Sequence, residues 1–206
     1  MRLWTLQGIE IYEQLQREGV AYCTKPSWAD EPRFIRAYHW MADQMRQRIG
    51  EPPIKGIEFP MWAWYQYISA KSNKPTRSLH DADDGLSAYM EIKIPDQDVI
   101  LSDFNSWHSV LNEDPIDDWK RIFKKTDQLE KEAGRRLSFD DYPLDLQKEM
   151  EKSWEGVFDL DRWKKEKYCR HRRNLSIQAT FWLLKPEHIV SVEILEKKGN
   201  VIKRIQ

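Results

Sequence analysis

Cysteine is scarce in this chain. The 206 residues contain two, Cys23 and Cys169, which lie far apart and in no Cys-x-x-Cys pair. This spacing argues against a disulfide framework or a cysteine zinc site and predicts reduced thiols. Long hydrophobic runs are also missing: no stretch approaches the roughly 20 apolar residues of a membrane helix, and no signal peptide is recognisable. We therefore expect a soluble, cytoplasmic protein.

Catalytic signatures are missing as well. The sequence has no P-loop, no GxGxxG, no HExxH and no GxSxG. Its five histidines do not fall at the spacing of metal ligands, so we expect no metal site. Lysine and arginine (33) nearly balance aspartate and glutamate (34), which leaves a net charge of -1. Overall charge therefore does not imply a nucleic-acid partner, although a local basic patch remains compatible with one.

What the chain does have is a regular alternation of strand and helix patterns. Strand-like alternation occurs over residues 2–7, 59–68 and 88–94, and helical periodicity over residues 34–49. Residues 176–194 read as a strand, a turn at Pro186 and a second strand. We predict a single α+β domain over residues 1–206, with a mixed or antiparallel sheet core, flanking helices and a helical insertion at about 116–165.

Several polar side chains lie on or beside these apolar strands. A buried amide or hydroxyl costs free energy unless it is paired, so such groups either bond to neighbours or face a cleft. The candidates are Thr5, Gln7, Tyr65, Asp103, His108, Gln178 and Thr180. The plainer interpretations are that the glutamines and threonines bond to nearby backbone, that Asp103 caps a helix and that His108 is a paired core histidine.

A cleft is the functional interpretation of the same residues. We expect the strand that starts near Ser176 to form its floor and the N-terminal strand to lie beside that floor. Thr5, Tyr65 and Gln178 should then converge on one cavity. This expectation is purely geometric, so the structure can test it directly.

A strongly basic segment precedes the predicted floor strand. It ends in Arg170, Arg172 and Arg173, and Trp163 and Tyr168 are interleaved with its lysines and arginines. Such a run is typical of a solvated helix face. The alternative is a phosphate-binding surface, because basic side chains neutralise phosphate and aromatic rings stack on bases.

Short motifs give the chain a resemblance to a bacterial family of about this length that has no established activity. They are Leu-Trp-Thr-x-Gln, Ala-Tyr-x-Trp-Met, Trp-Ala-Trp-Tyr, Leu-Ser-Asp-Phe-x-x-Trp-His and Gln-Ala-Thr-Phe-Trp, at residues 3–7, 37–41, 62–65, 101–108 and 178–182. Together they span nearly the whole chain.

The layout also resembles the ADP-ribosyltransferase fold. Those enzymes open with a short strand and a helix that ends in glycine, as residues 3–19 do, and close with a strand, Pro-x-x-Ile and a further strand, as residues 181–189 do. The usual His or Arg of the first strand is Thr5, and the usual glutamate of the late strand is missing near Gln178. Asp103 or Glu91 would then have to stabilise the positive ribose.

The resemblance implies NAD as substrate and a macromolecular acceptor. Trp4, Thr5 and Gln7 would line the nicotinamide side, Tyr65 would stack, and Arg77 would meet the diphosphate. Asp103, His108 and Gln178 would orient the acceptor or stabilise developing charge. Arg170, Arg172 and Arg173 favour RNA or DNA as acceptor, which would fit a bacterial toxin or antiphage effector, with an antitoxin as a possible partner. The alternatives are a non-catalytic nucleic-acid-binding module and a nuclease that uses Asp103 and His108.

Overall fold

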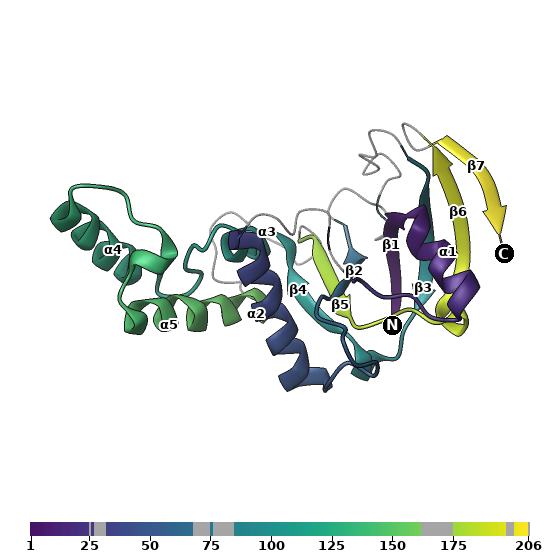
Figure 1. Cartoon of the computed structure of the whole chain (residues 1–206), viewed down its shortest axis with the longest axis horizontal. Coiled ribbons are helices and arrows are strands. Elements are labelled where there is room, and N and C mark those ends of the chain that lie inside the picture. Colours follow the sequence, from purple (N-terminus) through teal and green to yellow (C-terminus); the bar gives the residue numbers. More distant parts are fainter. Residues whose placement is uncertain are drawn as a thin grey trace.

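Seven strands form one antiparallel sheet in the computed structural model, in the order β4-β5-β2-β1-β3-β6-β7 (Figure 1). The structure describes residues 1–24, 26, 32–67, 75, 85–161, 175–196 and 200–205. The strands are β1 (Arg2–Gly8), β2 (Met61–Gln66), β3 (Ser87–Lys93), β4 (Ile100–Asp103), β5 (Ile177–Phe181), β6 (Ile189–Glu196) and β7 (Asn200–Ile205). The predicted α+β class is confirmed, and every strand pairing is antiparallel.

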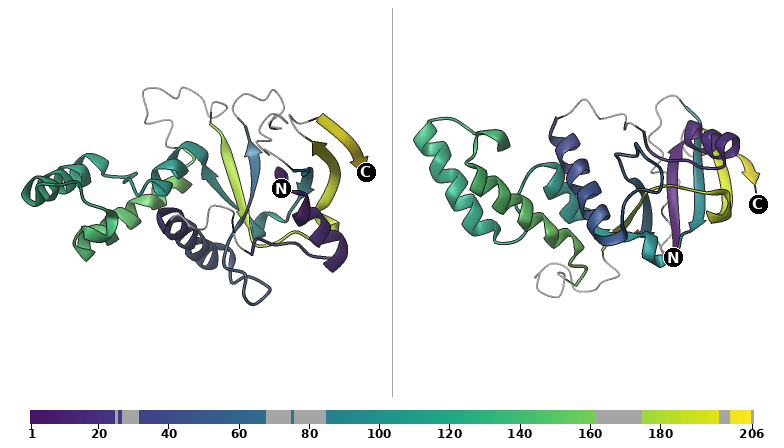
Figure 2. Two further views of the ribbon diagram at one scale, coloured as in Figure 1. Left: turned by 45° about the horizontal axis from the view of Figure 1, so that its top comes forward. Right: turned by 60° about the horizontal axis from the view of Figure 1, so that its bottom comes forward.

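Five α-helices accompany the sheet in the described part of the chain. They are α1 (Ile9–Glu18), α2 (Pro32–Ile49), α3 (Phe104–Leu111), α4 (Trp119–Ala133) and α5 (Leu144–Ser153). Short 3-10 helices include η4 (Trp154–Phe158), which continues α5, and η7 (Pro186–His188), which precedes β6. The helices expected within residues 116–165 are α4, α5 and η4. They extend away from the β4 side of the sheet, at the opposite end from β7 (Figures 1 and 2).

Helix α1 covers one face of the sheet. It follows β1 directly and ends at Gly19, which adopts the left-handed conformation that favours glycine (φ 68°). Leu15 of α1 packs against inward side chains of the sheet strands, among them Leu3 and Phe181. Strand alternation explains this face, because every second residue of β3 from Ala88 to Ile92 is apolar and belongs to it, as do Leu3 of β1 and Val192 and Ile194 of β6.

Helices α2 and α3 cover the other face beside β4 and β5. The helical periodicity of residues 34–49 is confirmed: Ala37, Met41 and Met45 are fully buried and pack with Trp107 of α3. The same hydrophobic cluster continues into the helical extension through Trp154 and Met150. Helices α4 and α5 are therefore joined to the sheet by one continuous core.

The expected neighbour of the first strand is wrong. We predicted that β1 lies beside the strand after Ser176, but β2 separates the two: β1 pairs with β2 and β3, and β5 pairs with β2 and β4. Apolar alternation makes both β1 and β5 buried strands without specifying which strand each one pairs with. The two nevertheless lie one strand apart in the same sheet.

Candidate functional site

The sheet is split between β1 and β2. These strands share a single register pair, Trp4 opposite Trp64, whereas β1 and β3 pair along all of β1. Next to the split, the Thr5 hydroxyl donates to the Trp62 carbonyl at 2.7 Å, and Gln7 Nε2 donates to Thr5 Oγ1 at 2.7 Å and to the same carbonyl at 3.3 Å. The side chains of Thr5 and Gln7 thus replace strand-to-strand bonds that the divergence removes.

A cavity of about 490 Å³ lies at this split. Its volume is in the range of small-molecule and cofactor sites. Residues from both faces of the sheet and from three helices line it: Gln7, Gly8, Glu10, Ile11, Cys23, Pro26, Tyr38, Pro60, Met61, Trp62, Trp107 and Gln178. The end of β1 and the start of β5 therefore contribute to one hollow, although the strands are not adjacent.

An aromatic cluster forms one wall of the cavity. The Tyr38 ring meets Trp62 edge-on at 5.6 Å between ring centroids and Trp107 at 5.4 Å, and the two indoles lie 4.9 Å apart. Burial raises the pKa of the Tyr38 hydroxyl well above its ordinary value. The sequence did not single out Tyr38, because the periodicity of α2 indicates burial without distinguishing core from cavity wall.

Two polar atoms of the wall are buried without a hydrogen-bond partner among the described residues. They are Gln178 Oε1, an acceptor, and Trp62 Nε1, a donor. Most buried polar groups in folded proteins are paired, and leaving one unpaired costs about 1–3 kcal/mol. Both residues line the cavity, and each of these two atoms is itself covered, so the wall contains one unsatisfied acceptor and one unsatisfied donor.

One carboxylate, that of Glu10, lies on the cavity wall. Glu10 is the only charged side chain among the described lining residues, and it has no hydrogen bond or ion pair within the described part of the chain. It occupies the first turn of α1, where the helix dipole favours negative charge. A β-carbon built on Gly8 would overlap the Glu10 carboxylate, so the absence of a side chain at Gly8 allows the carboxylate to occupy its observed position. Sequence reasoning missed Glu10, since a first-turn glutamate is common on any helix.

The other candidates from β1 and β2, which are Thr5, Trp4 and Tyr65, do not line the cavity. Thr5 is 1% exposed, but its hydroxyl bonds to two residues that do line it, Gln7 and Trp62. Trp4 packs with Tyr89 and Leu195 on another part of the sheet, and Tyr65 packs with the cluster under α1. Of Thr5, Tyr65 and Gln178, only Gln178 lines the predicted common hollow.

Asp103, which ends β4 and caps α3, and His108 of α3 both lie outside the set of lining residues. Asp103 Oδ1 accepts from the Ser106 amide at 2.7 Å, so Asp103 is the helix cap that the plainer interpretation predicts. Asp103 Oδ2 is buried and has no partner within the described residues. His108 is exposed, and its Nδ1 lies 2.9 Å from the Phe104 carbonyl, so it is not a core histidine. Glu91, the other carboxylate considered, forms an ion pair with Arg2.

Four of the predicted site residues cannot be placed. Arg77, Arg170, Arg172 and Arg173 lie outside the described residues. The diphosphate contact and the basic nucleic-acid surface assigned to them stay predictions.

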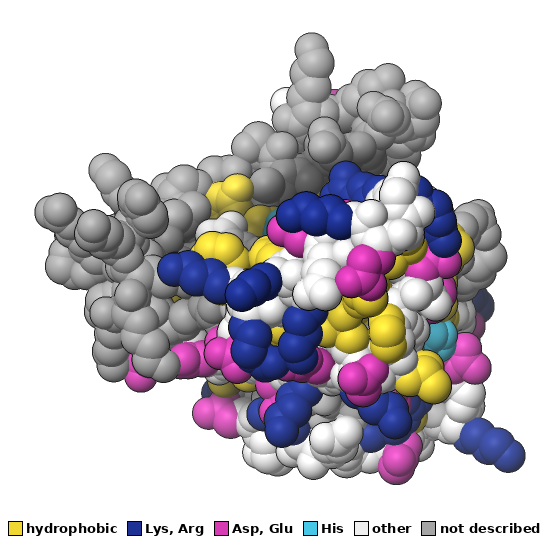
Figure 3. Space-filling view, turned by 90° about the vertical axis from the view of Figure 1, so that its left-hand side faces the viewer, with side chains coloured by type: hydrophobic (Ala, Val, Ile, Leu, Met, Phe, Trp, Pro, Cys, Tyr) yellow, Lys and Arg dark blue, Asp and Glu magenta, His cyan; other side chains and the backbone are white. Residues whose placement is uncertain are grey.

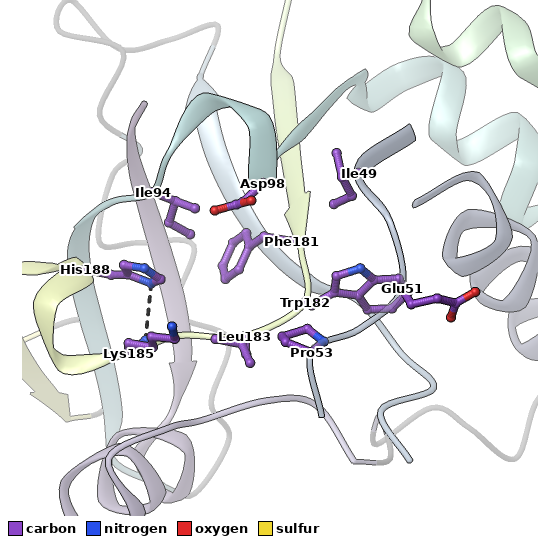
Figure 4. Close-up of a pocket in the computed structure, with 10 residues that line it drawn as sticks. All are labelled: Ile49, Glu51, Pro53, Ile94, Asp98, Phe181, Trp182, Leu183, Lys185 and His188. Carbon is purple, nitrogen blue, oxygen red and sulfur yellow. Dashed lines mark hydrogen bonds between the residues drawn. The ribbon is translucent and has the colours of Figure 1, made fainter. Parts of the chain in front are cut away.

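A second cavity, of about 250 Å³, lies at the end of β5 that leads to η7 (Figure 4). Phe181, Trp182 and Leu183 form its apolar part, and Asp98, Lys185 and His188 are polar residues around it (Figure 4). Burial lowers the pKa of His188, an effect that Glu187 opposes and Lys185 reinforces. None of the residues predicted from the sequence lines this second cavity.

The thiol of Cys23 provides a chemical probe of the first cavity. Burial raises its pKa to about 11, and only the thiolate reacts with alkylating agents. In a Cys169→Ser variant, iodoacetamide should modify Cys23 about a hundredfold more slowly at pH 8 than an unburied cysteine, and about tenfold faster for each pH unit up to about 10. Mass spectrometry of the intact protein measures this. A rate that levels off below about pH 9 would contradict the assignment.

The fold is that of an α+β protein with an open seven-stranded antiparallel sheet. Residues 2–190 match the family described as "Domain of unknown function (DUF3841)", and the chain belongs to this family. No curated protein and no solved structure matches it. The described helices include none with both the length and the apolar composition needed to cross a membrane. Within the described residues, no three His, Cys, Asp or Glu side chains gather as metal ligands would.

Proposed function

We propose that the chain is an NAD-dependent mono-ADP-ribosyltransferase. Its acceptor is a macromolecule, RNA or DNA by preference, and its biological role is that of a bacterial toxin or antiphage effector. The observation that carries the proposal is the cavity at the split of the sheet, where Gln7 of β1, Glu10 of α1 and Gln178 of β5 meet.

The order of elements supports this assignment. An ADP-ribosyltransferase-like layout requires an opening strand followed by a helix that ends in glycine, and β1, α1 and Gly19 have that order. It also requires a late strand, a Pro-x-x-Ile turn and a further strand. Strand β5, Pro186 at the start of η7, and Ile189 at the start of β6 have that order too. The opening elements line the first cavity, and the closing elements contribute to both cavities, through Gln178 to the first and through Phe181 and His188 to the second.

The reaction explains why the polar groups of the first cavity matter. An acceptor oxygen or nitrogen forms a bond to C1′ of the nicotinamide ribose, and the bond from C1′ to nicotinamide breaks, with the electron pair leaving on nicotinamide. The acceptor loses a proton to solvent or to a nearby base. Positive charge develops on the ribose in the transition state, and a fixed negative group stabilises it more than it stabilises the substrate.

Within this proposal each wall group has a task. The Glu10 carboxylate stabilises the positive ribose. It takes the role of the glutamate that is missing from the late strand, in place of the earlier candidates Asp103 and Glu91. Gln178 Oε1 accepts a hydrogen bond from the substrate, and Trp62 Nε1 donates one; the carboxamide of nicotinamide offers both counterparts. The rings of Tyr38, Trp62 and Trp107 provide apolar surface against which a planar ring packs.

Two measurements on the pure protein test the proposal. Saturating NAD should raise the melting temperature, because a ligand that binds only the folded state stabilises it. Incubation with labelled NAD and total cellular RNA, DNA and protein should label one of these fractions. The absence of both a melting shift and a labelled fraction would remove the proposal.

A Gln178→Leu variant separates a ligand contact from a structural one. Because Gln178 Oε1 has no partner in the described part of the protein, replacing the amide with an apolar group should leave the stability of the free protein unchanged or raise it. Loss of one hydrogen bond should weaken NAD binding about 2- to 10-fold. Thermal unfolding with and without NAD measures both effects. A variant that is destabilised without NAD would show that Gln178 serves the fold instead.

A further inference from the structure

Helix α4 has two different faces. Ile122, Thr126 and Leu129 face the core that α4 shares with α5. On the same side, Arg121 and Lys125 both pair with Glu149 of α5. This face is fully accounted for by packing and by ion pairs.

The flank of α4 next to this face exposes aromatic rings. Trp119 is 47% exposed and Phe123 is 37% exposed, and their rings meet edge-on at 6.1 Å between centroids. Lys120 Nζ lies 5.4 Å from the centre of the Trp119 ring. Large exposed aromatic rings at a protein surface are typical of interaction sites, because their burial by a partner is favourable.

A shallow hollow of about 400 Å³ follows this face of α4. It is lined by Trp119, Lys120, Phe123, Lys124, Asp127, Gln128 and Lys131. The end of the molecule that α4 and α5 form carries exposed hydrophobic side chains among which lysine, arginine, aspartate and glutamate side chains are interspersed (Figure 3). The hollow thus combines aromatic surface with positive charge along one helix.

The charge of the hollow is mainly positive and unpaired. Lys120, Lys124 and Lys131 form no ion pair with any described residue, in contrast to Lys125 on the other face. Asp127 is the single carboxylate among the lining residues. A row of free ammonium groups beside exposed rings matches a partner with a phosphate backbone and planar bases.

We propose that this face of α4 binds single-stranded nucleic acid. A base stacks on the exposed Trp119 ring, and Lys120, Lys124 and Lys131 contact the phosphates. Binding needs no NAD and is separate from the transferase cavity. Only the identification of the bound strand as the acceptor rests on the proposed function.

Fluorescence anisotropy with a fluorescein-labelled oligouridylate of about 20 nucleotides tests this surface, with the full chain and without NAD. Affinity should fall steeply as salt rises. Trp119→Ala should weaken binding about 5- to 100-fold, the effect of losing one stacked base. Lys120→Gln with Lys124→Gln should reduce the slope of log affinity against log salt by about 1.4, because each lost phosphate contact removes about 0.7 for single strands.

Lys125→Gln is the matched control, because this lysine lies on the same helix but pairs with Glu149. It should leave both the affinity and the salt slope unchanged, and circular dichroism should show the same helix content in every variant. Failure of the wild type to bind the oligonucleotide would overturn the proposal. So would binding by the Trp119→Ala and double-lysine variants that is as tight as that of the wild type. Neither result depends on whether NAD is a substrate.

Discussion

If the proposed transferase reaction takes place, Glu10→Gln should reduce nicotinamide release from NAD by up to about 10²-fold, the lower end of the loss seen when one electrostatic group is removed from a transition state, because Glu10 is exposed to solvent. Glu10 is the only carboxylate among the described residues that line the cavity, and nothing in the described part of the chain neutralises it. Glutamine keeps the size of the side chain and removes its charge. Chromatographic measurement of nicotinamide, with water as the acceptor, gives the rate without knowledge of the natural target.

The same substitution should hardly affect the fold. Glu10 is exposed, and such a surface change usually alters the free energy of unfolding by about 0.5 kcal/mol or less. NAD should still raise the melting temperature. Glu13→Gln is the matched control, because Glu13 is exposed on the same helix but does not line the cavity. Equal rates for the two variants would exclude Glu10 from the reaction and leave NAD binding as a separate question.

Trp154→Ala should lower the free energy of unfolding by about 3–5 kcal/mol, the usual cost of deleting a buried tryptophan side chain. Trp154 is 0% exposed, and its Nε1 donates to the Asp114 carbonyl at 3.0 Å. Its ring packs against Trp40 and Phe139, each with centroids 5.7 Å apart. Since domains are stable by only about 5–15 kcal/mol, this loss is a large share of the total.

The lost free energy should mainly weaken the packing of the helical extension against the sheet, because η4 contacts α3, α5 and β4. Urea unfolding followed by circular dichroism measures it. Leu144→Ala on α5 is the control: Leu144 is 71% exposed, so its truncation should change stability by about 0.5 kcal/mol or less. A loss of less than about 1 kcal/mol in the Trp154 variant would show that the extension is held elsewhere.

Local patterns in the sequence predicted the elements well. The period of α2, the alternation of β1 and β3, and the cap at Asp103 all depend on neighbours in the chain, and each is present. The neighbour of β1 was wrong, because alternation shows which residues share a face and contains no information about which strands pair. Strand order is decided by contacts between distant segments.

The candidate site was only partly predictable for the same reason. Gln7 and Gln178 were found because an amide on an apolar strand is unusual and needs a partner. Glu10 and Tyr38 were missed because a glutamate in a first helical turn and a tyrosine on an amphipathic helix are both ordinary. Their importance comes from the position of the split in the sheet, which no local pattern marks.

The divergence of β1 from β2 also places two strand edges opposite each other inside the sheet. Open edges normally recruit another strand, which is the usual route to peptide addition or aggregation. Here the side chains of Thr5 and Gln7 already donate hydrogen bonds to the Trp62 carbonyl. An extended peptide would have to break both bonds to pair with that carbonyl. The opening is therefore protected against strand insertion and stays available to a compact molecule that brings its own polar groups.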